Sequence, residues 1–346
     1  MFEEYLRSNF HTPYGAVVGN EAADADSIVS ALITAYVLSK KHGNLYVPIV
    51  QCDREDMMMK REVRALFEWA WNFSDLPAPS VENCLRFNEE STDLLKPGVV
   101  KKWVLTDHNS PTGIFKDISP IELVIDHHAI LDGDIGERRI VELVGSACTL
   151  VGKEFWEFLC PVTMRLLLGV IIIDTFRNGK ETAADMEIRT RLENQLKIDQ
   201  TEKLGHLLVG LRDDSDFWAN LPHSLRLKSD YKEIKKIGIS TIRQNMDVFI
   251  KGHGLIAIEE FADKKNLKIM IVLAAEYNRR VLLAFSHDVD ILQDLRCQLL
   301  KSSLGVFEVV DFGSIGDHFI VLGVEMKSTR KQVLPFMHTF INSYST

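Results

Sequence analysis

The sequence lacks the features of a membrane or secreted protein. No run approaches the ~18 apolar residues that a membrane-spanning helix needs. The longest apolar run, 166–173, has a length that favours a buried strand. The first ten residues, MFEEYLRSNF, carry early acids and no apolar core, so they do not resemble a secretory signal. We therefore expect a cytoplasmic protein that does not associate with membranes.

Cysteine is scarce, and its spacing excludes a Cys-x-x-Cys motif and a structural zinc site. The five cysteines form no Cys-x-x-Cys pair and no Cys/His pattern typical of structural zinc. Their number is odd and their spacing wide, so we expect reduced thiols, as in cytosolic proteins. They are Cys52, Cys84, Cys148, Cys160 and Cys297.

A basic surface is also missing. The formal net charge is −9, and basic residues do not alternate with aromatic ones as in grooves that bind single strands. A nuclease is therefore disfavoured, and we expect no nucleic-acid partner. The charge is uneven: residues 1–190 hold 19 Lys+Arg against 29 Asp+Glu, whereas residues 191–346 hold 21 against 20. Chance can produce such a split, but an acidic half would also suit cation binding.

The first half of the chain alternates strand-like and helical segments. An amphipathic pattern over 27–41 predicts a helix that ends at Gly43, and helical spacing recurs over 57–71 and 146–159. Strands that alternate with helices are typical of βαβ units and a mostly parallel sheet. The predicted strands lie at 16–20, 45–51, 102–109, 121–128 and 166–175.

The second half predicts a smaller domain with a different sheet. A length of 346 residues suggests about two domains, and the polar helical pattern over 186–212 suits a connection. Further strands are expected at 234–243, 267–276, 281–286 and 319–326, with a helix at 290–301. The expected fold class is α/β. It comprises an N-terminal mostly parallel sheet flanked by helices (1–190), a helical linker (191–212), and a smaller C-terminal α/β domain with a mixed sheet (213–346).

Acidic and imidazole side chains follow four of the predicted strands. Ligands of open parallel sheets bind beyond the carboxyl ends of the strands, so we expect these side chains to converge. Converging carboxylates repel one another unless cations neutralise them, and oxygen ligands with one or two imidazoles suit Mg²⁺ or Mn²⁺. A single aspartate after a strand is more often a helix N-cap, as Asp24 could be. The residues are Asn20, Asp24, Asp26, Asp107, His108, Asp126, His127, His128 and Asp174.

These motifs resemble those of the DHH phosphoesterases. IELVIDHHA holds the Asp-His-His triplet that names the family, and GNEAADADS resembles its first motif. LTDHN and IIIDT resemble the motifs that accompany them, in order and in spacing. The second half resembles the DHHA2 accessory domain of family II pyrophosphatases, cytosolic exopolyphosphatases and prune proteins. The segments that carry this likeness are SDYKEIKKIGIS (229–240) and KSTRKQVLP (327–335).

The resemblance implies two divalent ions that activate a water molecule, with Mg²⁺ favoured and Mn²⁺ as the alternative. Asp24 and Asp107 would bind one ion, and Asp26, Asp107, His127 and Asp174 the other. Asp126 would orient the imidazoles, and His108 would support the ligands without touching the metal. The implied catalytic residues are His128, Asp126 and Asn20, and the implied substrate-binding residues are His128, Lys232, Arg330 and Lys331.

Two departures from the pyrophosphatase pattern favour an exopolyphosphatase. Family II pyrophosphatases have His where this chain has Asn20, and an amide oxygen, as a harder and weaker ligand, should favour Mg²⁺. GNEAADADS and VPIVQCDRED (47–56) are most similar to exopolyphosphatase segments. Thr329 stands where a basic residue is usual, which argues against tight specificity for pyrophosphate.

The resemblance therefore implies a hydrolase of phosphorus-containing acid anhydrides. The favoured activity is an exopolyphosphatase that releases orthophosphate from the ends of inorganic polyphosphate, with a basic channel formed in part by Lys228, Lys232, Lys235 and Lys236. Inorganic pyrophosphatase is the main alternative. A prune-like protein that acts on nucleotides or through partners is disfavoured, because such proteins usually carry a further interaction tail.

Overall fold

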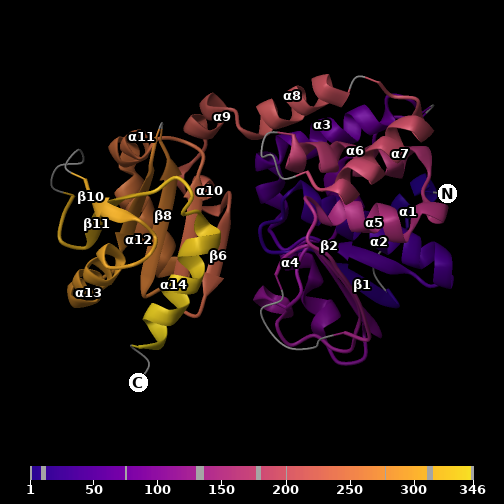
Figure 1. Ribbon diagram of the computed structural model, residues 1–346. Coiled ribbons are helices and arrows are strands. Elements are labelled where there is room, and N and C mark those ends of the chain that lie inside the picture. Colours follow the sequence, from indigo (N-terminus) through magenta and orange to yellow (C-terminus); the bar gives the residue numbers. More distant parts are fainter. Residues whose placement is uncertain are drawn as a thin grey trace. The chain divides into compact units, whose positions relative to one another are not determined.

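The computed structural model describes residues 2–8, 13–74, 76–129, 136–176, 181–199, 201–276, 278–309 and 315–343. They form two units, Met1–Arg212 and Asp213–Thr346, each with its own sheet and its own apolar core (Figure 1). The predicted fold class, α/β with one parallel and one mixed sheet, is confirmed. Within the described residues, no helix is both long and apolar enough to cross a membrane.

The first unit is built on a five-stranded sheet in the order β2-β1-β3-β4-β5, and every neighbouring pair is parallel. Four strands coincide with predicted apolar runs. The edge strand β5 was not predicted, because its sequence RRIV is half basic and only partly buried. Parallel strands end at one edge of the sheet, which is where the site lies. The strands are β1 (Gly15–Val18), β2 (Tyr46–Ile49), β3 (Lys102–Thr106), β4 (Ile121–Asp126) and β5 (Arg138–Val141).

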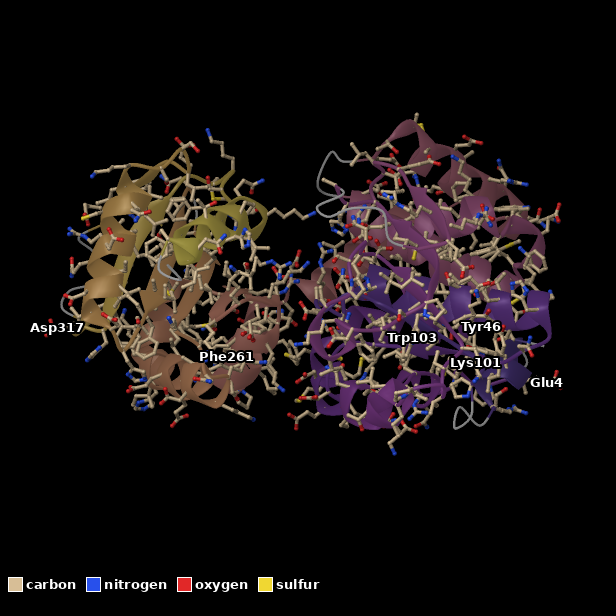
Figure 2. The ribbon with its side chains drawn as sticks, turned by 90° about the horizontal axis from the view of Figure 1, so that it is seen from below. Glu4, Tyr46, Lys101, Trp103, Phe261 and Asp317 are labelled. Atoms are coloured by element: carbon tan, nitrogen blue, oxygen red, sulfur yellow. The ribbon has the colours of Figure 1, made fainter. Side chains whose placement is uncertain are left out.

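Apolar side chains cover both faces of this sheet. Successive residues of a strand point to opposite faces, so Val17 packs with the main helices and Val18 packs on the other side. Figure 2 marks Tyr46, which belongs to the helical side, and Trp103, which belongs to the other. The helices are α1 (Phe2–Leu6), α2 (Ala25–His42), α3 (Arg61–Trp71), α4 (Asn88–Ser91), α5 (Ala147–Glu154), α6 (Pro161–Thr175), α7 (Ala183–Leu196) and α8 (Thr201–Arg212).

The apolar run at 166–175 corrects the sequence prediction, because it forms most of helix α6 and not a strand. Leu167 and Ile171 are completely buried, and α6 packs against α2, α3, α5, α7 and α8. A helix that is covered on all sides is apolar on all sides, so periodicity cannot distinguish it from a buried strand. Pro161 at the first turn is the start signal that indicates a helix. Asp174 therefore reaches the site from the end of a helix.

The segment 191–212, expected to be a linker, lies within the first unit. It comprises the end of α7 and the whole of α8, and α8 packs on α3 and α6. Leu204 and Leu208 supply the apolar face for this packing. The polar residues that suggested a connection form the solvent face of an amphipathic helix.

The second unit is built on a six-stranded sheet in the order β10-β11-β9-β8-β7-β6. Only β7 and β8 are parallel, and the other neighbours are antiparallel. Ile271 of β8 packs with α13 and α14, whereas Val272 packs with α10 to α12, so helices cover both faces. The strands are β6 (Tyr231–Ile234), β7 (Ile237–Ile242), β8 (Ile269–Ala275), β9 (Arg280–Phe285), β10 (Val306–Glu308) and β11 (Phe319–Val324). The helices are α9 (Ser215–Asn220), α10 (His223–Lys228), α11 (Met246–Phe249), α12 (Leu255–Lys264), α13 (Val289–Leu300) and α14 (Arg330–Asn342).

The contact between α6 and α3 generates the first prediction. A Cβ atom on Gly169 would overlap the side chain of Leu66, so Gly169→Ala should destabilise the protein by about 1–3 kcal/mol. Urea denaturation followed by circular dichroism measures this change. Gly210 of α8 has nothing within 4 Å of its would-be Cβ, so Gly210→Ala serves as the control. It should instead stabilise the helix by about 0.5–1 kcal/mol. Equal effects of the two substitutions would contradict the packing described here.

Candidate metal centre

The site lies at the carboxyl edge of the parallel sheet in the first unit. The loop after β1 and the start of α2 supply the first group of side chains, and the residues that follow β3 supply the second. The end of β4 and the end of α6 supply the rest. The side chains concerned are Asn20, Asp24, Asp26, Asp107, Asp126, His127, His128 and Asp174.

Asp107 is the residue that the others surround. Its side chain is 2% exposed, and its Oδ1 lies 3.2 Å from His127 Nε2 and 3.7 Å from His128 Nδ1. Its backbone has a φ of 62°, a left-handed conformation that a non-glycine residue keeps only where its surroundings hold it. Three ligand atoms from Asp107, His127 and His128 lie within 4.8 Å of one another. These residues come from two neighbouring strands, as the sequence analysis expected.

Asn20 contacts Asp107 through its amide nitrogen. Its Nδ2 donates to the Asp107 carbonyl at 3.2 Å and also to carboxylate Oδ2. Its Oδ1 accepts from the Ala22 backbone N–H at 2.8 Å, which fixes the orientation of the amide. The sequence interpretation treated Asn20 as a source of an oxygen ligand. In the structure its oxygen is bound within its own loop, and its nitrogen holds the central carboxylate.

Asp26 lies against the start of α5. It accepts hydrogen bonds from Ser146 Oγ at 2.6 Å, from Ala147 N at 2.7 Å and from Cys148 N at 2.9 Å. The first backbone N–H groups of a helix have no partner within the helix and stabilise an anion placed there. His127 Nε2 lies 3.6 Å from Oδ2, the oxygen that accepts from Ala147 N. Asp26 is therefore fixed by α5 while it faces the centre.

His127 is oriented by a backbone carbonyl. Its Nδ1 lies 2.9 Å from the Val144 carbonyl, so Nε2 is the nitrogen that meets Asp107 and Asp26. Burial opposes a charged imidazole, but the hydrogen bond with Asp107 and the charge of Asp26 outweigh it. Together they raise the pKa of His127 to about 10. Without a metal, this histidine would serve as the cation of the centre.

Asp126 lies behind the two histidines and is completely buried. It accepts from the His127 backbone N–H at 2.8 Å and from His128 Nδ1 at 2.8 Å. Burial alone would raise its pKa, but the hydrogen bond and charge of His128 hold the pKa below its ordinary value. Asn109 Nδ2 donates to the same carboxylate at 2.6 Å and to the Ala129 carbonyl at 3.1 Å. The sequence analysis did not single out Asn109, because nothing in its spacing pointed to Asp126.

Negative charge is concentrated at this centre. Burial raises the pKa of Asp107 and Asp174 well above the ordinary range, and the charges of Asp26 and Asp24 raise both pKa values further. Arg212 lowers the pKa of Asp174, but its effect is smaller than those of Asp26, Asp24 and Asp107. Asp24 is also the N-cap of α2, where it accepts from Ser27 N at 3.0 Å. Asp24 thus has the N-cap role considered from the sequence, and it also lies close enough to Asp107 for its charge to raise the pKa of Asp107.

The donor set fits divalent cations. Carboxylates that raise one another's pKa values are stabilised by positive charge placed between them, and oxygen donors with an imidazole suit Mg²⁺ or Mn²⁺. His108 contributes no atom to the cluster of ligand atoms formed by Asp107, His127 and His128, and its Nδ1 lies 2.9 Å from the carbonyl of Thr106. The residues that would hold the metal are Asp24, Asp26, Asp107, His127 and Asp174, with His128 within reach of Asp107.

The basic residues named from the sequence lie in the second unit. Arg330 begins α14, and its Nη1 contacts Asp230 at both the carboxylate (2.9 Å) and the carbonyl (3.1 Å). Lys232 lies on β6, and Lys331 is exposed. Lys235 Nζ donates a hydrogen bond to Asn342, the last residue of α14. At a rise of 1.5 Å per residue, Asn342 lies ~18 Å along the helix from Arg330. Lys235 and Arg330 therefore lie at opposite ends of α14.

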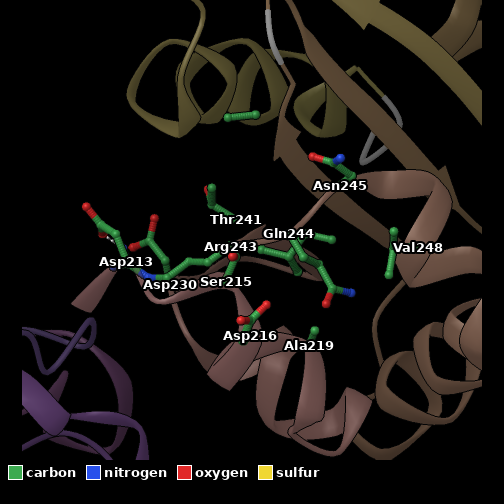
Figure 3. Close-up of a pocket in the computed structure, with 12 residues that line it drawn as sticks. Asp213, Ser215, Asp216, Ala219, Asp230, Thr241, Arg243, Gln244, Asn245 and Val248 are labelled. Atoms are coloured by element: carbon green, nitrogen blue, oxygen red, sulfur yellow. Dashed lines mark hydrogen bonds and ion pairs between the residues drawn. The ribbon is translucent and has the colours of Figure 1, made fainter. Parts of the chain in front are cut away.

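A cavity of about 650 Å³ lies at the carboxyl ends of β7 and β8 in the second unit (Figure 3). Its lining includes Asp213, Asp216 and Asp230 together with Arg243. Arg243 Nη1 is already paired with Asp213 at 2.7 Å. Asp230 is paired with Arg330, which is not in the lining. The lining thus holds three carboxylates and one arginine that already has a partner, which does not suit an anionic ligand. The cavity is therefore not assigned to phosphate binding.

Comparisons with known proteins agree with this architecture. The DHHA2 domain model matches residues 219–340. The chain is similar to Exopolyphosphatase PRUNE1 of Rattus norvegicus, with 25% identity over 96% of this chain and 76% of that protein. It is similar to the Manganese-dependent inorganic pyrophosphatase of Methanocaldococcus jannaschii, with 25% identity over 65% of this chain and 70% of that protein.

The structure resembles a crystal structure from Methanococcus jannaschii that is assigned to the family II inorganic pyrophosphatases. The TM-score is 0.63 at 18% identity, and the match covers 95% of this chain and 99% of that one. At this identity the likeness shows a shared fold. The DHHA2 match and the named relatives agree with the predicted resemblance to DHH phosphoesterases that carry a DHHA2 domain.

The charges of the centre predict how the stability of the metal-free protein depends on pH. The folded-state pKa values of Asp107, Asp174 and His127 all lie above their ordinary values. Each group therefore contributes stability that is present at low pH and is lost as the pH rises through the raised pKa. For His127 this window runs from 6.5 to about 10. We expect the melting temperature in EDTA to fall across this window.

Added Mg²⁺ should offset this loss, because a bound cation takes the place of the protons. The increase in melting temperature caused by Mg²⁺ should therefore grow with pH. His127→Ala should show a weaker dependence on pH than the unmodified protein. An increase of equal size at both ends of the window would contradict the assignment of these groups to a cation site.

Proposed function

We propose that this relative of the DHH phosphoesterases is a metal-dependent exopolyphosphatase that releases orthophosphate from the ends of inorganic polyphosphate. The first unit would be the catalytic domain, and the second would bind the substrate. The metals would be two divalent ions, with Mg²⁺ the first choice and Mn²⁺ the second. We expect the enzyme to act in the cytoplasm.

One observation supports this proposal above the others. Asp107 is buried between two imidazoles and an amide, and it lies close enough to Asp26 and Asp24 for their charges to raise its pKa. Such a set of groups is stabilised by cations and has no evident purpose in packing. Divalent ions, when bound, supply charge that neutralises phosphate oxygens and lowers the pKa of a water molecule. That chemistry is what the cleavage of a phosphoanhydride requires.

The residues of the chain would hold and orient the reacting groups. His128 donates its Nδ1 proton to Asp126, which leaves Nε2 as the nitrogen that can meet a substrate oxygen. Its side chain is 31% exposed, whereas that of Asp126 is completely buried. Water adds its oxygen to the terminal phosphorus, and the bridging oxygen leaves with the shortened chain. Arg330, Lys232 and Lys331 would bind phosphate oxygens from the second unit, because a guanidinium can grip two such oxygens and a lysine ammonium attracts them as a point charge.

Inorganic pyrophosphatase is the second candidate, since one of the two relatives above carries that name. The two activities share their chemistry and differ in the length of the substrate. Phosphate release should be measured on pyrophosphate, tripolyphosphate and long-chain polyphosphate, each with Mg²⁺ and with Mn²⁺. We expect the chain-length series to favour tripolyphosphate and longer substrates. Activity on pyrophosphate alone would replace this proposal with the second candidate, and inactivity on all three would overturn both.

Asp107→Asn should abolish turnover while the protein remains folded. Asparagine has the same shape and tolerates a left-handed backbone, so the change removes chiefly the charge. Loss of a residue behind a metal ligand costs about 10–100-fold in activity, and loss of the shared ligand should cost more. Steady-state kinetics together with circular dichroism test this expectation. A folded variant with normal turnover would overturn the site.

Arg330→Ala should raise KM more than it lowers kcat, because the residue is proposed to bind substrate and not the metal. Affinity for Mn²⁺ in the absence of substrate should not change. Arg296 provides a control, since it is an arginine of the same unit with an ion pair to Glu308 at 2.6 Å. Arg296→Ala should leave KM unchanged. A normal KM in Arg330→Ala would remove Arg330 from the substrate site.

A further inference from the structure

We propose that Asp185 is a positioning residue for the metal ligands Asp26 and His127, although it belongs to none of the strand-end motifs. The inference rests on the proposed function, because it concerns the same metal centre. Asp185 lies in the first turn of α7 and is completely buried. A buried carboxylate is costly unless hydrogen bonds satisfy it, so the partners of this one indicate its role.

Asp185 joins three segments of the first unit. Its Oδ2 accepts from Gly145 N at 2.7 Å and from the backbone N and hydroxyl of Thr182, both at 2.8 Å. Its Oδ1 accepts from Thr149 Oγ1 at 2.6 Å. The contacts with Thr182 form the capping box of α7. Those with Gly145 and Thr149 reach 36 to 40 residues back along the chain, so a helix cap does not require them.

The Gly145 contact lies between the groups that hold two metal ligands. The residue before it is Val144, whose carbonyl lies 2.9 Å from His127 Nδ1. The residue after it is Ser146, whose hydroxyl donates to Asp26 at 2.6 Å. The hydrogen bond that Gly145 N donates to Asp185 thus fixes the Val144–Gly145 peptide, which carries this carbonyl and directly precedes the residue that carries the hydroxyl.

The Thr149 contact fixes the helix to which Asp26 is bound. Thr149 lies in the first turn of α5, next to Cys148, whose N–H donates to Asp26 at 2.9 Å. Asp185 therefore holds the start of α5 at a second point. A displacement of α5 would move the donors of Asp26, and a displacement of the preceding loop would move the acceptor of His127.

The packing around Gly145 leaves no room for a side chain. A Cβ atom there would lie 2.9 Å from Asp185 Oδ2 and 2.7 Å from Thr175 Cγ2. Thr175 follows the proposed ligand Asp174 directly in the chain. The loop at Gly145 is thus held between Asp185 and the end of α6. The end of α6 also carries Asp174, the third proposed ligand. Groups that orient metal ligands typically affect metal affinity by about 10–100-fold.

Asp185→Asn tests the proposal, because it keeps the shape but places an amide donor against N–H and O–H donors. We expect the Kd for Mn²⁺, measured by titration calorimetry on the full chain without substrate, to rise by about 10–100-fold. Phosphate release should recover at high Mn²⁺ concentration. A residue that serves the fold alone would not give this recovery, since excess metal would not correct a loss of folded protein.

Thr182→Val is the matched control, because it removes the hydroxyl of the capping box and leaves Gly145 and Thr149 untouched. It should lower the melting temperature without changing the Kd for Mn²⁺. If Asp185→Asn does not fold, Thr149→Val replaces it and should raise the Kd several-fold. An unchanged Kd in the folded variant, or an equal rise in Thr182→Val, would overturn the role of Asp185. A wild-type chain that binds no Mn²⁺ would instead overturn the proposed function.

Discussion

Aspartate side chains meet at the carboxyl edge of the parallel sheet, and their mutual repulsion is the constraint on which the rest of the first unit depends. Burial and neighbouring carboxylates raise the pKa values of Asp107 and Asp174. The fold relieves part of this repulsion with neutral donors, namely the start of α5 at Asp26 and the amide of Asn20 at Asp107. Backbone N–H groups and amides reduce the cost of a buried charge without cancelling it. The remaining charge is what fits this edge for a cation.

Two hydrogen-bonded layers give this site its geometry. In the inner layer, the Val144 carbonyl sets the ring of His127 and Asp126 sets the ring of His128. In the outer layer, Asn109 holds Asp126, and Asp185 holds the loop that follows Val144. Each outer contact is short, at 2.6 or 2.7 Å. Rigid support of this kind keeps like charges close together, which unsupported side chains would avoid by turning away.

Most of the fold could be predicted from the sequence, because parallel strands have continuous apolar runs and end with polar residues. The run before Asp174 was the exception: a fully covered helix and a buried strand have the same pattern. Edge strands β5, β6 and β10 carry polar residues, so they gave no signal. Asn109 and Asp185 were missed for another reason. Their partners are distant in the chain, and buried hydrogen bonds between distant residues leave no periodicity.

In the proposed function, the chemistry belongs to the first unit and the choice of substrate to the second. Pyrophosphate and polyphosphate present the same terminal P–O–P group, so the carboxylates and imidazoles of the first unit cannot distinguish them. Under the proposed function, discrimination would come from groups that meet the rest of the phosphate chain, and we assign those groups to the second unit, which matches the DHHA2 domain. In that unit two contacts with Asp230 fix the guanidinium of Arg330, the residue proposed to bind substrate. A group fixed in advance loses less entropy on binding, so chain-length preference should depend on how many such groups the second unit presents.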